Sequence, residues 1–479
     1  MLKPSGTYHP AVPIDSPLFL LAFLPVLLVL HAVCPRVLRE GLLLAASLLF
    51  YAISSTATLP FFAASMLGNL ILGLIIERAA GALRARLTAL GVVLNLALLA
   101  WSKYLGFLAG TIPGLEFVKT MAPDAMPLGV SFFTFAAVAY LVDIGRGSAQ
   151  AEKNPVRFCL FFSFFPKIAA GPIARHKDMA AGPQTPGLED VRAGFARISI
   201  GLAKKVFIAG TLAPMADAAF GERAGNLDLG TAWLGLVSYS LQLYFDFAGY
   251  TDMAVGLGRV FGYRLPENFN YPYISQSVRE FWRRWHMTLS LWFRDYLYIP
   301  LGGGRVAPWK IQRNLLVVFT LCGLWHGASW SFVIWGFWHG VFLSLERTSL
   351  GRLLDRLPRV FRHTYALFAV MLGWVFFRAP DLSHAWEYFR ALAGMNPGGF
   401  GYTWMMRINH AYMLMLILAI AGAAQILPWL GSRLGGAQNG AALGTIRAAA
   451  LSLLPPALLA LSIMQLAAGT YSPFIYAQF

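Results

Sequence analysis

Charge is scarce in this chain. Only 13% of its 479 residues are charged and 57% are hydrophobic, whereas a soluble domain usually carries about 25% charged residues. This balance excludes a water-solvated globular protein. Cys34, Cys159 and Cys322 have no paired spacing, which argues against a disulfide framework or a zinc site. We also find no phosphate-binding loop, no Ser-His-Asp order and no other metal-ligand spacing, so we expect no metal and no tightly bound cofactor.

What the chain has instead is long uncharged runs. A spanning helix needs about 20 apolar residues, and a run of about 30 holds two spans, or one span and a re-entrant piece. We therefore expect an all-α, multi-pass membrane protein with roughly ten to twelve spans. The runs are Ser16–Pro35, Gly41–Ile76, Leu87–Ser102, Ala125–Val142, Asn314–Leu345, Ile408–Ser432 and Ala448–Phe479.

Basic residues exceed acidic ones, with 38 Lys and Arg against 22 Asp and Glu and a net charge of +16. In a membrane protein this excess indicates basic loops held on the cytoplasmic side rather than nucleic-acid binding. The densest basic groups, Arg279–Arg313 and Arg347–Arg362, are accordingly placed in the cytoplasm.

Two segments depart from the pattern of simple spans. Phe158–Arg175 is too short to cross, and Pro166 interrupts it, so we expect a re-entrant or interfacial element. Gln276–Leu301 is rich in Trp, Arg and Tyr, a composition that predicts an amphipathic helix near the cytoplasmic interface. On one continuous helix, Arg283 and His286 would share a face. An interfacial anchor explains this composition as well as a functional site does.

Two histidines lie inside the uncharged run Asn314–Leu345. A titratable ring in a bilayer-length segment is costly and suggests a functional site. His326 is flanked by Gly323 and Gly327, a spacing that allows close approach of a helix or a ligand. It is a candidate general base, with an interhelical hydrogen bond as the alternative. His339 is 13 residues further on, a rotation of about 220° on a continuous helix, so the two histidines could not then face one pocket. A break in the helix at Gly327–Trp330 would leave their relation open. We favour a structural role for His339.

Asp246 and Asp252 end another apolar run and need a partner or water. Arg259 and Arg264 follow closely and are the expected partners. Structural pairing and positioning of a substrate or donor are both open for Asp246.

Several motifs of this sequence together resemble those of a known protein family. The stretch Asn268-Phe-Asn-Tyr-Pro-Tyr, the block from Glu280-Phe-Trp-Arg-Arg-Trp-His286 to Gly303, and the block Gly323-Leu-Trp-His326-Gly-Ala-Ser-Trp resemble the membrane-bound O-acyltransferase family. The bacterial branch that contains the alginate O-acetyltransferase membrane subunit is the most similar. Further landmarks are Met126–Phe135, Ala170–Arg175, Tyr244–Met253, Trp335–Gly340 and Ser472–Tyr476. The similarity covers residues 16–479 as one membrane domain, with residues 1–15 as an N-terminal extension.

The resemblance implies tilted and broken helices that form a funnel around a tunnel, with the acyl donor entering from the cytoplasm. By position, His326 matches the family's catalytic histidine and His286 its second conserved polar position. Trp325 would line the tunnel. Arg283, Arg284 and Arg305 would attract the phosphates of acetyl-coenzyme A or an acyl-carrier arm, although an orientation signal alone explains them equally well.

The expected function is acetyl transfer across a bacterial inner membrane to a secreted, alginate-like polysaccharide. The expected partners are the thioester donor, the polysaccharide, membrane lipid and a periplasmic acetyltransferase of the lipase–esterase (SGNH) kind. D-alanyl transfer to teichoic acid is the alternative within enzymes. A membrane transporter and a structural scaffold are the alternatives outside them.

Overall fold

The computed structural model describes residues 13–123, 125–180, 182–221, 226–396, 408–426, 429 and 441–469. Within these ranges the chain is built from helices and connecting turns, with no strand. The all-α prediction is therefore confirmed. The landmark Ser472–Tyr476 and the first twelve residues of the N-terminal extension lie outside the described residues.

The chain divides into two compact units. The first unit comprises Met1–Phe195 and Met253–Pro266, and the second comprises Ala196–Asp252 and Glu267–Phe479. Two helices, α10 (Leu188–Ala203) and α12 (Leu229–Val260), contribute residues to both units.

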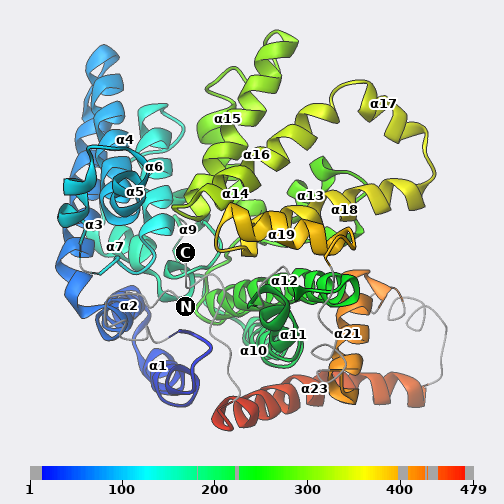
Figure 1. The fold of residues 1–479 in the computed structure, drawn as a ribbon. Coiled ribbons are helices and arrows are strands. Elements are labelled where there is room, and N and C mark those ends of the chain that lie inside the picture. The colour runs from blue at the N-terminus through cyan, green and yellow to red at the C-terminus, as the bar shows by residue number, and fades with distance from the viewer. Residues whose placement is uncertain are drawn as a thin grey trace. The chain divides into compact units, whose positions relative to one another are not determined.

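In the first unit α3, α4 and α6 lie side by side, and α7 packs on α2 (Figure 1). Its helices are η1 (Phe19–Phe23), α1 (Leu24–Val33), η2 (Arg36–Leu38), α2 (Arg39–Ser54), η3 (Thr56–Thr58), α3 (Leu59–Arg78), α4 (Gly81–Lys103), α5 (Leu105–Thr111), η4 (Glu116–Met121), α6 (Val130–Gly145), α7 (Pro155–Ser163), α8 (Phe165–Ile168) and α9 (His176–Met179).

Polar and small residues join the helices of this unit. Asn69 on α3 and Asn95 on α4 exchange amide hydrogen bonds of 3.1 and 2.8 Å. Gly73 lets α3 approach α6, because a Cβ atom there would lie 2.6 Å from the ring of Tyr140. Such contacts are how apolar helices associate where lipid removes the hydrophobic driving force.

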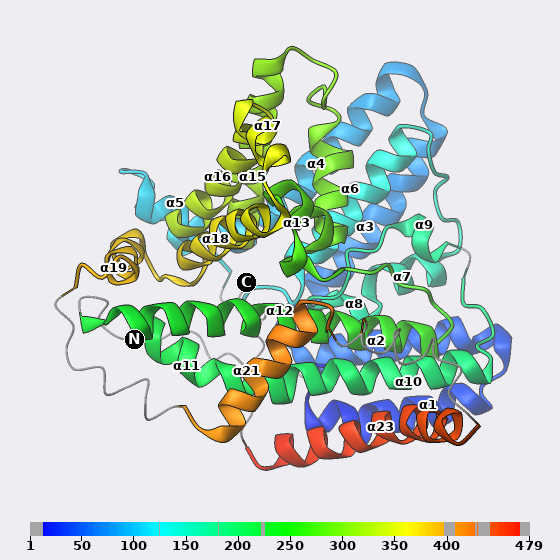
Figure 2. The ribbon, with the colours of Figure 1, turned by 90° about the vertical axis from the view of Figure 1, so that its right-hand side faces the viewer.

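The second unit is dominated by the hairpin of α15 and α16, on which α18 packs, and the hairpin is also visible in Figure 2. The helices of this unit are η5 (Lys204–Ala209), α11 (Gly210–Gly221), η7 (Pro272–Ile274), α13 (Val278–Arg284), α14 (Met287–Phe293), η8 (Arg294–Tyr298), α15 (Pro308–His326), α16 (Trp330–Leu345), α17 (Ser349–Arg356), α18 (Arg359–Arg378), α19 (Leu382–Leu392), α21 (His410–Ala423) and α23 (Ala441–Ala467).

In the part of the chain that the structure describes, five segments are long and apolar enough to cross a membrane: Arg36–Ser54, Thr56–Arg78, Gly81–Lys103, Leu188–Gly221 and Arg359–Arg378. Five shorter apolar helices accompany them, at Phe19–Val33, Val130–Gly145, Trp330–Leu345, His410–Ala423 and Ser452–Ala467. The multi-pass prediction is thus confirmed. Leu188–Gly221 was missed by the search for uncharged runs because it carries Arg197, Lys204 and Lys205.

Two local predictions have different outcomes. The segment Phe158–Arg175 is interrupted as expected, with α7 ending at Ser163 and the four-residue α8 following. Gln276–Leu301, in contrast, is not one helix. It breaks at His286, whose φ of 43° and ψ of 54° are left-handed, so Arg283 and His286 do not share a helical face.

The break at His286 has a physical cause in a neighbouring segment. The Asn270 amide donates to the Arg284 carbonyl, and the Met287 amide donates to the Asn268 carbonyl, both at 2.9 Å. These bonds occupy the backbone groups that a continuous helix would need.

Candidate active site

His326 lies at the C-terminal end of α15 and is only 1% exposed. The chain leaves the helix at Gly327, whose φ of −160° is extended, and α16 begins at Trp330. The predicted break in this run is therefore present, and it allows α16 to fold back against α15.

Glycines bring the two helices of the hairpin into backbone contact. A Cβ atom at Gly323 would lie 2.1 Å from the Phe332 carbonyl oxygen, and one at Gly336 would lie 2.1 Å from the Phe319 carbonyl oxygen. The predicted close approach at Gly323 is thus made by α16. It places His326, three residues further along α15, beside aromatic side chains of its neighbours rather than against lipid.

Aromatic rings surround the His326 imidazole. The ring centroids of Trp325 and Trp335 are each 4.9 Å from it, and that of Phe377 on α18 is 5.4 Å away. Trp335 also contacts His339, at 5.2 Å. Because the hairpin reverses direction, His326 and His339 face one aromatic cluster, which a single continuous helix would have prevented.

His286 comes to the same site from the α13–α14 junction. Its side chain is completely buried, and its ring centroid is 6.4 Å from that of His326 and 6.3 Å from that of Trp325. Phe247 on α12 meets the ring edge-on at 4.9 Å. The structure therefore brings together His286, His326 and Trp325.

Two residues that hold this junction were not predicted. Asn268 accepts hydrogen bonds from the His286 ring and from Thr288. Glu346, at the end of α16, accepts from the amides of Val278 and Arg279 at 2.6 and 3.0 Å and so anchors the start of α13. Asn268 opens one of the motifs that carry the resemblance, but its contact with His286 cannot be read from its sequence position.

The three candidate arginines have different surroundings. Arg284 is held by Glu280 at 2.9 Å and also donates to the Asn270 carbonyl. Arg283 and Arg305 are exposed, and neither forms an ion pair with a described residue. Arg305 follows a turn in which Gly302 and Gly303 have positive φ values of 100° and 57°.

Asp246 directly precedes Phe247, which contacts His286, but its carboxylate has a partner on another helix. It forms a buried ion pair with Lys205. Its neighbour Asp252 is bound by Lys204 at 2.6 Å and by Arg197 at 2.8 Å. The expected partners were wrong, because Arg259 and Arg264 both pair with Asp190, at 3.0 and 3.6 Å.

The local geometry explains this pairing. Lys204 and Lys205 begin the π-helical turn η5, and the carboxylates that they reach are six residues apart on α12. Gly249 lies between the two carboxylates in sequence, and a Cβ atom there would be 2.8 Å from Lys205 Cγ. Structural pairing of Asp246 is therefore the interpretation that the contacts support.

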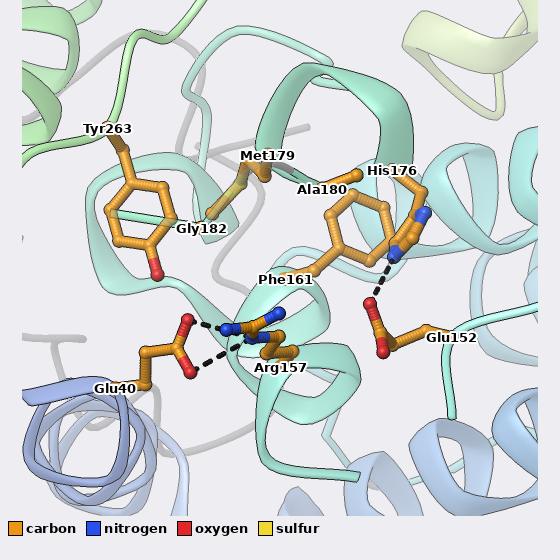
Figure 3. Close-up of a pocket in the computed structure, with 9 residues that line it drawn as sticks. All are labelled: Glu40, Glu152, Arg157, Phe161, His176, Met179, Ala180, Gly182 and Tyr263. Atoms are coloured by element: carbon orange, nitrogen blue, oxygen red, sulfur yellow. Dashed lines mark hydrogen bonds and ion pairs between the residues drawn. The ribbon is translucent and has the colours of Figure 1, made fainter. Parts of the chain in front are cut away.

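A separate small pocket lies in the first unit and is lined by none of the predicted site residues (Figure 3). Arg157 Nε is 3.0 Å from Glu40 Oε1, and His176 Nε2 is 3.5 Å from Glu152 Oε2. Arg157 and Glu40 thus form an ion pair and His176 contacts Glu152, which favours a structural role for this pocket.

His176 makes the stability of this region depend on pH. Burial lowers the pKa of His176 below 6.5, and this effect exceeds the opposing influence of Glu152 and Asp143. A lowered pKa means that folding favours the neutral ring, so its contribution to stability is present above about pH 6.5 and is lost as the pH falls below it. We expect the melting temperature of the purified protein to fall between about pH 7.5 and pH 5, and His176→Gln to reduce that fall. An equal fall in the variant would contradict this assignment.

The family of the chain follows from comparison with known proteins. Residues 131–383 match the model of MBOAT, the membrane-bound O-acyltransferase family. The chain belongs to this family, and it is a multi-pass membrane O-acyltransferase.

Individual relatives are similar over different lengths. "Probable alginate O-acetylase AlgI" of Azotobacter vinelandii is 39% identical over 97% of this chain and 99% of its own length. "Peptidoglycan O-acetyltransferase" of Helicobacter pylori is 36% identical over 80% of each chain. "Teichoic acid D-alanyltransferase" of Bacillus subtilis is 33% identical over 45% of this chain and 58% of its own length.

Proposed function

We propose that this protein moves an acetyl group from cytoplasmic acetyl-coenzyme A across the bacterial inner membrane, for O-acetylation of a secreted or cell-surface polysaccharide. The observation that carries the proposal is the similarity to an alginate O-acetylase over almost the whole of both chains. The similarity to a D-alanyltransferase covers less than half of this chain, which favours acetyl over D-alanyl transfer.

The proposed chemistry is attack of a hydroxyl oxygen on the thioester carbonyl carbon. His326 accepts the hydroxyl proton as the new carbon–oxygen bond forms. The carbon–sulfur bond then breaks, and the departing thiolate takes the proton from His326, which leaves an acetyl ester and free coenzyme A. An imidazole is suited to this exchange because it binds and releases protons near neutral pH.

The aromatic surroundings of His326 support this assignment. Trp325, Trp335 and Phe377 pack around its ring, and a site that excludes water protects a thioester from hydrolysis. His286 lies within the same cluster and orients the reacting groups. A tunnel that connects this cluster to both faces remains part of the proposal.

A periplasmic acetyltransferase of the lipase–esterase kind is the proposed partner that completes the transfer to polymer. The direct test is transfer of labelled acetyl from acetyl-coenzyme A by the purified protein, with and without that partner. Polymer labelling that requires both proteins supports the proposal, whereas transfer of D-alanine from a carrier protein and none of acetyl would contradict it.

The exposed cations Arg283 and Arg305 supply a second test. If they attract the donor phosphates, Arg283→Gln/Arg305→Gln will raise the KM for acetyl-coenzyme A with little change in kcat, since they act on a part of the donor remote from the reacting carbon. The difference from wild type should shrink as salt is added. The control is Arg192→Gln, which replaces an exposed arginine on α10 that pairs with Glu189. An unchanged KM would leave these arginines as an orientation signal.

A further inference from the structure

The contacts of Asn268 determine which nitrogen of His286 carries its proton. Asn268 Oδ1 lies 3.1 Å from His286 Nδ1, 3.2 Å from the Thr288 backbone nitrogen and 2.9 Å from Thr288 Oγ1. The Thr288 amide can only donate, so the side-chain atom of Asn268 that faces it must be the oxygen. The same oxygen faces His286 Nδ1, which therefore donates to it.

A neutral imidazole carries one proton, so a proton on Nδ1 leaves Nε2 as an acceptor. His286 Nε2 is buried and forms no hydrogen bond with a described residue. The centroid of this ring is 6.3 Å from that of Trp325 and 6.4 Å from that of His326. The lone pair of His286 Nε2 is therefore buried within the cluster that contains the proposed base, His326.

We infer that Asn268 is a positioning residue that fixes His286 in the Nδ1–H tautomer, so that Nε2 presents a hydrogen-bond acceptor, and not a donor, to the cluster that contains His326. This inference rests on the proposed function and makes it more specific. His286 could orient either the donor carbonyl or the base. Because its only ring proton is donated to Asn268, a neutral His286 in this tautomer cannot polarise the thioester carbonyl, so we assign it to orientation of the base.

The charge around His286 is consistent with a neutral ring. Among the described residues, the titratable group in ring contact with it is His326, and its other ring contacts are Phe247 and Trp325. The nearest cation along the chain, Arg284, is held by Glu280. An amide at position 268 fixes the tautomer without adding a charge, whereas a carboxylate there would favour the imidazolium.

The first experiment reads the tautomer without reference to activity. The protein is labelled with ¹⁵N in its histidine rings, and the His286 signals are assigned by their loss in His286→Gln. We expect a protonated Nδ1 and an unprotonated Nε2 in wild type. A protonated Nε2 would overturn the inference even if acetyl transfer is fully active.

The second experiment uses Asn268→Asp, which keeps the shape and the acceptor oxygen but adds a negative charge. The added carboxylate favours the imidazolium form of His286, which has no lone pair with which to accept a hydrogen bond. The acidic limb of the pH profile of kcat/KM for acetyl transfer should therefore shift to higher pH by about one unit or more. The KM for acetyl-coenzyme A should change little. Asn270→Asp, two residues away and exposed, adds the same charge outside the site and is the matched control.

The outcomes separate this inference from the proposed function. A folded Asn268→Asp protein with the wild-type pH profile would overturn the role of Asn268, while acetyl transfer itself still stands. Absence of acetyl transfer by wild type, with the predicted tautomer present, would instead refute the proposed function. If Asn268→Asp does not fold, the ¹⁵N measurement on wild type decides the matter.

Discussion

Polymer acetylation will be lost when His326 is replaced by Ala, although the protein still reaches the membrane. A positioned general base contributes about 10²–10⁴-fold to rate, so the initial rate of labelled acetyl transfer should fall by at least about 100-fold. The loss should appear in kcat rather than in the KM for the donor, because the ring acts at the reacting hydroxyl.

The control for this prediction is His410→Ala, which removes an exposed imidazole at the start of α21 and should leave the rate unchanged. The melting temperature of His326→Ala must be measured alongside, because the ring contacts Trp325 and Trp335. A stable His326→Ala protein with wild-type acetyl transfer would refute the base assignment.

The second large effect is on stability. Lys205 is only 5% exposed, and its ammonium group contacts the Asp246 carboxylate. Asp246→Ala removes that carboxylate. Removal of one partner of a buried ion pair costs about 3–5 kcal/mol, so we expect a large fall in the melting temperature and in the amount of folded protein.

The double variant Lys205→Met/Asp246→Leu distinguishes a structural pair from a donor-positioning carboxylate. Replacement of both members by apolar residues is often neutral or stabilising, so the double variant should recover most of the stability and the acetyl transfer lost in Asp246→Ala. Recovery of stability without recovery of activity would show that Asp246 acts in catalysis.

The sequence predicted those elements that are defined by a long uncharged run or by the spacing of small residues. The run Asn314–Leu345 predicted a membrane segment, and Gly323 and Gly327 predicted the close contact that α16 makes. The possible break near Gly327 was also visible, and it explains why His326 and His339 meet at Trp335.

The parts that were missed depend on contacts between distant segments. The helix predicted over Gln276–Leu301 ends at His286 because the backbone of Asn268 and Asn270, well upstream, bonds to it. The partner of Asp246 was misassigned for the same reason. Arg259 and Arg264 are nearer in sequence, but Lys205 is the residue that reaches Asp246.

The most direct test of the account uses sealed vesicles that contain the purified protein. Labelled acetyl-coenzyme A is supplied on the cytoplasmic face, and the periplasmic partner with its polysaccharide is enclosed on the other. We predict ester-linked label on the enclosed polymer with wild type and background label with His326→Ala. Label that crosses equally well without the imidazole at position 326, or that enters as intact donor, would contradict the account.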